Sequence, residues 1–119
     1  MKTFRQAIET QDLEAAVRLF AEDATFRSPA VHNPYQGRAQ VEAILRAAMA
    51  TFEDFRYERE LADDRGHALV FRARVGDREV EGCDFLRTNE AGEIDELVVM
   101  IRPLSGLTAL AQAMAEKLS

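Results

Sequence analysis

A single carboxylate in an apolar stretch is the residue best suited to chemistry. In an extended segment, Asp84 shares one face with the apolar residues Val80 and Leu86. Burial among such neighbours can raise a carboxyl pKa by up to ~3–5 units, which keeps the acid neutral near pH 7 and able to donate a hydrogen bond. The alternative is an ordinary cross-strand ion pair between this aspartate and Arg72 or Arg74 on the neighbouring segment. On the residues alone, both interpretations stay open.

Four other polar side chains could act beside this acid. His32 lies in the loop 29–37, which we expect to rim a pocket, and its pKa would suit proton transfer near neutrality, although loop histidines without a role are more common. Ser28 should point inward, but its hydroxyl is suited to a local hydrogen bond beside the following proline. Tyr35 and Tyr57 could each donate a hydrogen bond into a pocket. Tyr35, between a proline and a glycine, is the better placed of the two, and a packed loop aromatic is the plainer alternative.

Helical periodicity predicts the elements that precede and follow a sheet. Residues 3–9 open with the capping box Thr3-x-x-Gln6, and Asp12 can cap a second short stretch that extends to Phe20, so that the two form one broken helix or two short ones. The remaining helices are a central one with the apolar stripe Val41, Ile44, Leu45, Ala48, Met49 and Phe52, and a C-terminal one, capped by Ser105, with the stripe Leu107, Leu110, Ala111, Met114 and Leu118.

The strands are predicted from alternation with a period of two. A short strand at 24–28 is stopped by Pro29, and the alternating segments that follow the central helix are 55–61, 67–75, 78–88 and 94–102. The turns between these four segments are of hairpin length, so consecutive strands should be antiparallel neighbours. One curved antiparallel sheet wrapped around the N-terminal and central helices would bury every apolar face. We therefore predict a single α+β domain over residues 1–119.

The last two strands are apolar on both faces, although a sheet face that is exposed to solvent does not need apolar residues. Cys83 and Phe85 lie on the face opposite Asp84, and Val98 and Met100 can continue that surface. A second copy of the chain would cover it, and this predicts a homodimer through the outer face of the sheet. The alternative is that the C-terminal helix covers the same face.

Composition excludes several classes of function. The net charge of −6 over 119 residues, with arginines scattered among acids, argues against binding to nucleic acid. No apolar run is long enough to span a membrane, and the first residues do not form a signal peptide, so we expect a cytoplasmic protein. The single Cys83 excludes an internal disulfide, and two distant histidines make a poor metal site. We expect neither a metal nor an organic cofactor.

Two segments resemble a known superfamily. The sequence Leu-Phe-Ala-Glu-Asp-Ala-Thr-Phe-Arg-Ser-Pro at 19–29, followed by a loop that ends in Gly37 and by an amphipathic helix, resembles nuclear transport factor 2-like domains. The segment 81–97, Glu-Gly-Cys-Asp-Phe-Leu-Arg-Thr-Asn-Glu-Ala-Gly-Glu-Ile-Asp-Glu-Leu, resembles the same domains. This group includes ketosteroid isomerases, scytalone dehydratases, limonene epoxide hydrolases and SnoaL-like polyketide cyclases. The resemblance implies a cone-shaped, cystatin-like α+β roll, and it leaves the activity open because this fold hosts many functions.

Compared with ketosteroid isomerases, the chain retains one of three functional positions. The family's base position, before the proline that ends the first strand, corresponds to Ser28, and its tyrosine position corresponds to Phe4. Its protonated aspartate corresponds to Asp84, which the resemblance therefore favours as a functional acid. The isomerase mechanism as the family runs it is not available without that base. The Asp-Arg-Asp set of limonene epoxide hydrolases is also incomplete, because Arg102 lacks the aspartate beside it.

These patterns predict a site for a small, mostly apolar molecule. Asp84 and His32 are the candidate catalytic residues. Such a domain would either catalyse proton transfer, as in isomerisation, cyclisation or dehydration, or bind a ligand or partner without catalysis. Residue 82 is a glycine, which would leave space beside the acid for a ligand. The predicted ligand-binding residues are Ser28, Tyr35, Phe26, Phe52, Phe71, Leu86, Leu97, Val99 and Ile101.

Overall fold

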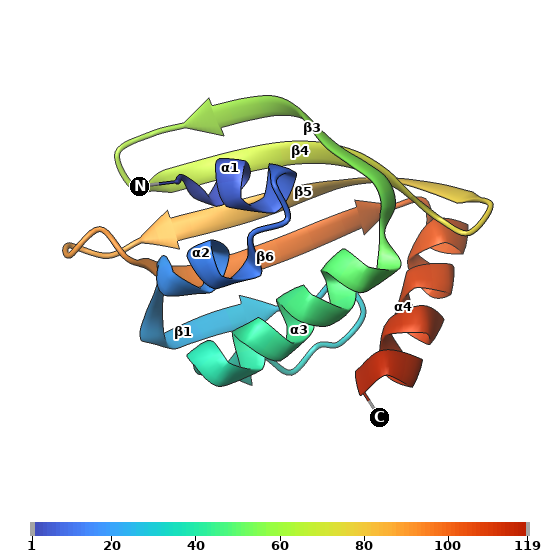
Figure 1. Cartoon of the computed structure of the whole chain (residues 1–119), viewed down its shortest axis with the longest axis horizontal. Coiled ribbons are helices and arrows are strands. Elements are labelled where there is room, and N and C mark those ends of the chain that lie inside the picture. The colour runs from blue at the N-terminus through green and yellow to red at the C-terminus, as the bar shows by residue number, and fades with distance from the viewer. Residues whose placement is uncertain (1, 119) are drawn as a thin grey trace.

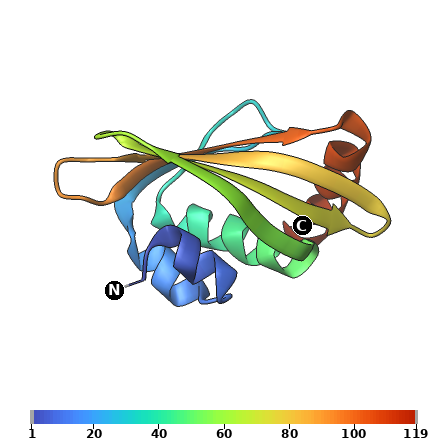
Figure 2. The same ribbon diagram turned by 90° about the horizontal axis from the view of Figure 1, so that it is seen from above.

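One six-stranded sheet curves around a set of helices in the computed structural model, which describes residues 2–118 (Figure 1). The helices are α1 (Phe4–Glu9), α2 (Leu13–Arg18), α3 (Arg38–Thr51) and α4 (Leu104–Leu118). The strands are β1 (Phe20–Arg27), β2 (Tyr35–Gln36), β3 (Glu53–Ala62), β4 (Gly66–Val75), β5 (Arg78–Thr88) and β6 (Ile94–Arg102). Figure 2 shows that all four helices lie on the same side of the sheet. The predicted α+β fold class is confirmed.

The sheet order is β2-β1-β6-β5-β4-β3, and it departs from the prediction at one strand pair. All neighbours are antiparallel except β1 and β6, which run parallel. The parallel pair arises because α3 and the three strands after it separate β1 from its neighbour, and such a connection is not a hairpin. The two-residue β2 within the loop 29–37 was not predicted, since it is too short to show a period.

The N-terminal capping patterns have the predicted geometry. Gln6 N donates to Thr3 Oγ1 at 3.1 Å, while Thr3 N donates to Gln6 Oε1 at 3.0 Å. Ala15 N donates to Asp12 Oδ1 at 3.1 Å, so α1 and α2 are two separate short helices. The apolar faces of both helices pack on the sheet, which places residues 4–11 above β3.

Two predicted boundaries are wrong for local physical reasons. Phe20 belongs to β1, not to the second helix, because it pairs with Ile94 of β6. Arg38 Nε and Nη2 both donate to the Phe20 carbonyl oxygen, at 3.0 and 2.7 Å. The fully buried Phe20 ring also meets Phe4 edge-on at 5.9 Å. Ser105 does not cap the last helix but lies inside it, and Leu107 N donates to the Pro103 carbonyl oxygen at 3.0 Å.

The last helix lies on the concave face, so it does not cover the outer face of the sheet. Helix α4 approaches β5 through Gly106, where a Cβ would lie 2.5 Å from Val80 Cγ1 and 3.0 Å from the Glu79 carbonyl oxygen. Only a glycine permits this close approach of helix and strand. The alternative of an outer face covered by α4 is therefore wrong, and this face is left without a helix (Figure 2).

The space beside Gly82 is filled by an aromatic ring, which contradicts the prediction that a ligand could enter there. A Cβ on Gly82 would lie 2.4 Å from Phe71 Cζ. Phe71 in turn stacks on Phe55 at 4.8 Å between ring centroids, and Phe55 meets Tyr57 edge-on at 4.9 Å. Glycine at this position allows the Phe71 ring to lie directly against β5, behind Phe55 and Tyr57, which line the concave interior.

Replacement of this glycine should disturb the cluster measurably. The Gly82→Ala variant should lower the free energy of unfolding by about 1–3 kcal/mol, because the methyl group overlaps the Phe71 ring and also lies 2.8 Å from the Met100 carbonyl oxygen. In the double variant Gly82→Ala/Phe71→Leu the loss should be smaller than the sum of the two single losses. Urea unfolding of the four proteins measures both quantities. A Gly82→Ala protein as stable as the wild type would show that the ring does not occupy this space.

Candidate functional site

A cavity of about 650 Å³ lies between the concave face of the sheet and the helices. Strands β3, β5 and β6, helices α1, α3 and α4 and the loop after β1 all contribute to its wall. Its apolar lining includes Phe4, Ile8, Phe26, Ile44, Leu45, Met49, Phe52, Phe55, Leu97, Val99, Ile101, Leu107, Leu110 and Met114. A cavity of this size and composition is typical of sites for small molecules.

One hydrogen-bonded pair of polar side chains lies deep in this apolar wall. Tyr57 Oη donates to Asp84 Oδ2 at 2.7 Å, and each residue is only 7% exposed. The two residues come from β3 and β5, on either side of β4, and both line the cavity. Alternation along each strand turns both side chains to the concave face, and the curvature of the sheet brings them together.

The protonation of this pair is set by its burial. Loss of solvent raises the pKa of Asp84 from its ordinary 3.8 to about 7, while the hydrogen bond from Tyr57 acts in the opposite direction and is the smaller effect. Burial and the nearby Asp84 both raise the pKa of Tyr57, so the phenol keeps its proton and remains the donor. Asp84 therefore exchanges its proton near neutral pH, and below that pH it is a neutral acid.

The second carboxyl oxygen of Asp84 faces the cavity. Within residues 2–118, no protein group hydrogen bonds to Asp84 Oδ1. The same part of the chain contains no side-chain nitrogen or oxygen that is both sealed from solvent and without a partner. Oδ1 is thus accessible from the cavity that Asp84 lines. When this carboxyl is protonated, it can donate one hydrogen bond to a molecule in that space.

The alternative of a cross-strand ion pair for Asp84 is contradicted. In the sheet Asp84 is paired with Leu69 of β4. Arg72 and Arg74 lie on the opposite face of β4 from Leu69, because side chains alternate along a strand. Arg72 pairs with Glu58 at 2.9 Å and with Glu81 at 3.1 Å. The guanidinium of Arg74 is likewise engaged by acids of β3. No cation of the described residues neutralises Asp84.

The other predicted site residues fall into three groups. Seven of them line the cavity, namely Ser28, Tyr35, Phe26, Phe52, Leu97, Val99 and Ile101. Phe71 and Leu86 are buried at 1% and 5% exposure but lie behind the lining, within the core. His32 is exposed in the loop between β1 and β2 and is not among the lining residues. Ser28 Oγ accepts a hydrogen bond from Ala30 N at 3.0 Å, the local role considered for it above.

The hydrogen-bond donor to Asp84 is Tyr57, whereas the sequence favours Tyr35 as the tyrosine that donates into a pocket. Tyr35 does line the cavity and packs on Phe26, with ring centroids 6.2 Å apart, but Tyr57 is the tyrosine that bonds to the acid. Alternation already turned Tyr57 inward with Phe55. What the sequence lacked was the bulged register of β3, which decides how far along the sheet the phenol reaches. The contribution of α4 and the acids Glu9 and Asp54 to the lining was also missed.

The described residues provide neither a metal site nor a membrane-spanning helix. Residues 2–118 hold no group of three histidine, cysteine, aspartate or glutamate side chains placed to bind a metal ion. None of the helices in this range is both long and apolar enough to cross a membrane. The cavity with its Asp84–Tyr57 pair is accordingly the candidate functional site.

Comparison with known proteins places this chain in a family. A family model described as the SnoaL-like domain matches residues 1–97. A solved structure described as a steroid delta-isomerase from Pseudomonas aeruginosa is 46% identical, with a TM-score of 0.90, over 94% of this chain and 83% of that chain. An uncharacterised bacterial protein with a cystatin-like fold, from Silicibacter pomeroyi, is 31% identical, with a TM-score of 0.91, over 96% of this chain and 81% of that chain.

A more distant structure shows the same fold. The structure described as a putative ketosteroid isomerase from Kribbella flavida is 22% identical, with a TM-score of 0.69, over 84% of this chain and 73% of that chain. No curated protein matches the chain. The resemblance to nuclear transport factor 2-like and ketosteroid isomerase-like domains is confirmed, and the chain belongs to the SnoaL-like domain family.

Proposed function

We propose that this protein binds a small, mostly apolar molecule in the cavity and holds an oxygen atom of that molecule with Asp84. The observation that carries the proposal is a carboxyl group that is 7% exposed, bonded through one oxygen to Tyr57 and open through the other to an apolar cavity of about 650 Å³. An apolar cavity with few convergent polar groups binds a ligand by its shape and orients it by those groups.

The same pair suits proton-transfer chemistry. A neutral Asp84 donates to a carbonyl oxygen, and it donates more strongly as negative charge develops on that oxygen when a neighbouring carbon loses a proton. Tyr57 keeps its hydrogen bond to the other carboxyl oxygen and fixes the orientation of the acid. Isomerisation, cyclisation and dehydration of a carbonyl compound can each proceed through such a state. The 46% identity to a protein described as a steroid delta-isomerase supports this class of reaction.

Binding without turnover is the second candidate function, and the structure offers a specific reason for it. Ser28 stands at the family's base position, and its hydroxyl accepts a local hydrogen bond from Ala30 N. His32, the replacement base considered from the sequence, lies outside the lining. The cavity would then position a ligand with Asp84 but lack a group beside it to remove the proton.

We also propose that two copies associate through the outer face of the sheet. Phe85 and Met100 are 41% and 59% exposed there, and no helix covers them. Cys83 pairs with Met100 and Phe85 pairs with Val98 across β5 and β6, so the four side chains form one continuous apolar surface. A twofold axis through this surface would cover it with its own copy.

A matched pair of ligands tests the binding function. At pH 6, 4-phenylcyclohexanone should bind at least about tenfold more tightly than phenylcyclohexane, because only the ketone accepts a hydrogen bond from Asp84. The preference should fall as the pH rises through about 7, since the donor proton is then lost. In Asp84→Asn, whose amide still donates, the preference should persist without that pH dependence, and in Asp84→Leu it should disappear. Amide-shift titrations by NMR give the affinities, and equal affinities for both ligands in the wild type would refute the role of Asp84.

Deuterium exchange separates catalysis from binding. In D₂O, a catalytic cavity should speed the exchange of the α-protons of bound 4-phenylcyclohexanone, and Asp84→Leu should remove the acceleration. Proton NMR follows the exchange directly. Tight binding with no acceleration would favour the binding module over the enzyme.

A charge on the outer face should separate the two copies. Phe85→Glu would bury an unpaired carboxylate in the dimer, so we expect a monomer by sedimentation velocity at a concentration where the wild type is dimeric. Leu104→Glu is the matched control, because Leu104 is 77% exposed on α4, away from this surface. A monomeric wild type would disprove the proposed association.

A further inference from the structure

The exposed residues of the cavity lining divide into a polar and an apolar group. Glu9, Gln11 and Asp54 are exposed and polar, and we call these three residues the polar mouth. They come from the end of α1, the turn after it and the start of β3. The other exposed lining residues, from the loop after β1 and the end of α4, are Ala30, Val31, Ala115 and Leu118. Ser28 and Tyr35 add two partly buried hydroxyl groups to the lining, whereas the exposed polar residues of the lining all belong to the polar mouth.

Asp54 is the residue of the polar mouth that lies in a strand bulge and accepts hydrogen bonds from two arginines. Its φ of 53° lies in the left-handed region, as does the φ of 55° at Gln11. At Asp54 the strand is also bulged, because three steps along β3, from Glu53 to Arg56, match only two steps along β4. Such a bulge redirects a side chain away from the regular alternation of the strand, and left-handed residues of this kind gather at ligand sites. Here the bulge places the Asp54 side chain at the edge of the cavity.

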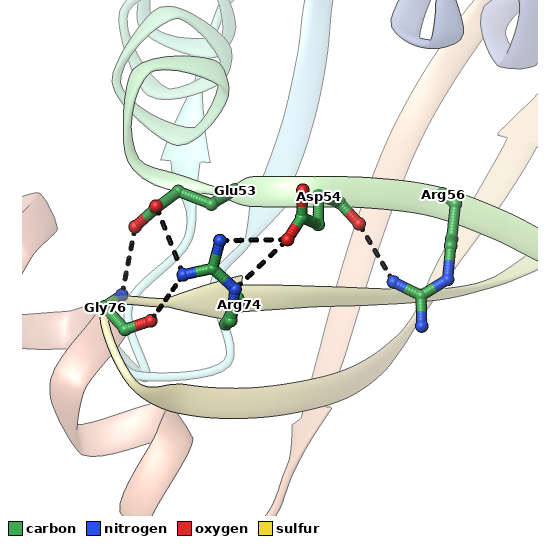
Figure 3. A network of polar contacts seen from close by, with 5 residues as sticks. All are labelled: Glu53, Asp54, Arg56, Arg74 and Gly76. Atoms are coloured by element: carbon green, nitrogen blue, oxygen red, sulfur yellow. Dashed lines mark hydrogen bonds and ion pairs between the residues drawn. The ribbon is translucent and has the colours of Figure 1, made fainter.

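A network of charged groups holds this side chain (Figure 3). Arg74 Nε and Nη2 both donate to Asp54 Oδ2, at 3.1 and 2.9 Å, and Arg56 Nη1 donates to the Asp54 carbonyl oxygen at 3.0 Å. Arg74 Nη1 donates to Glu53 Oε2 and to the Gly76 carbonyl oxygen, at 3.2 and 2.8 Å. The three bonds that reach Asp54 use only its Oδ2 or its carbonyl oxygen, so Oδ1 is left to accept from a ligand.

The charges are arranged so that acceptors, and not cations, face the cavity. Asp54 and Glu9 line it, whereas their partners Arg74 and Arg5 are not among the lining residues. Each carboxylate is paired with a guanidinium, so an additional positive charge is not needed. The group that suits this opening is a neutral hydrogen-bond donor such as a hydroxyl, and a carboxylate would be repelled.

Asp84 is another carboxylate of the lining, and it lies deeper in the same cavity than the exposed Asp54. Tyr57, which holds Asp84, follows Asp54 by three positions on β3, and because the bulge shortens this stretch Asp54 and Tyr57 are separated by less than roughly 10 Å along the strand. We propose that the ligand is an elongated molecule with an oxygen acceptor at Asp84 and a hydroxyl group at Asp54, joined by an apolar body. This inference rests on the proposed function of the cavity.

Three ligands that differ at one end test it. They are 4-phenylcyclohexanone, 4-(4-hydroxyphenyl)cyclohexanone and 4-(4-oxocyclohexyl)benzoic acid, which end in hydrogen, a hydroxyl and a carboxylate. The wild type should bind the hydroxyl compound about tenfold more tightly than the unsubstituted ketone, and the carboxylate most weakly of the three. NMR titration at pH 6 gives the three affinities. Equal binding of the first two would refute the hydroxyl recognition while leaving the proposed function intact, and no binding of any compound would contradict both.

Variants of neighbouring acids assign the effect to one residue. Asp54→Gly removes the carboxylate and suits the positive φ, so the protein should fold and should lose the preference for the hydroxyl compound. Asp54→Asn, which also tolerates this backbone, should weaken the preference and improve binding of the carboxylate. Glu53→Gln is the matched control, because Glu53 belongs to the same network but lies outside the lining, and it should bind as the wild type does. A preference that survives both Asp54 variants would exclude Asp54 as the recognition group.

Discussion

The buried hydrogen bond between Tyr57 and Asp84 is the constraint on which the rest of the site depends. It holds a carboxyl group in an apolar wall without a cation, and the burial there raises the pKa of Asp84 to about 7 although the hydrogen bond itself acts in the opposite direction. In the unfolded chain the same group has its ordinary pKa of 3.8. Its proton therefore stabilises the fold fully below pH 4, and that contribution, on the order of 4 kcal/mol, is lost as the pH rises through about 7. A protein that keeps such a costly group buried retains it for a reason other than stability.

The scaffold explains how this group can remain open to a ligand. Gly82 lets the Phe71 ring lie flat against β5, and the aromatic cluster beside it supports Tyr57 from the side. Gly106 lets α4 approach the concave face and close the far wall of the cavity. The bulge at the start of β3 then sets both the reach of Tyr57 and the place of Asp54. Two glycines and one strand bulge thus determine the shape of a site that lies between regular elements.

The helices and strands could be predicted from the sequence better than the tertiary contacts between them. The periods of the helices and strands, the capping box at Thr3 and the inward face of Asp84 could all be read from local patterns, and they agree with the structure. The partner of Asp84 could not, because a contact across an intervening strand depends on register, and a bulge changes the register without a clear signal in composition. Helix α4 was recognised as amphipathic, but only tertiary packing shows which face of the sheet it covers. The left-handed backbone at position 54 could not be predicted either, because the residue there is an aspartate and not a glycine or asparagine, which would have indicated it.

The pKa of Asp84 in the unliganded protein is the most direct test of this account. A titration followed by the side-chain carboxyl ¹³C resonance, assigned with the Asp84→Asn variant, measures it without a ligand or an assumed reaction. The account predicts a midpoint near 7, well above the exposed aspartates of the same protein. A midpoint near 4 would mean that the carboxyl is ionised at neutral pH and cannot donate a hydrogen bond into the cavity, which would contradict the proposed role of Asp84.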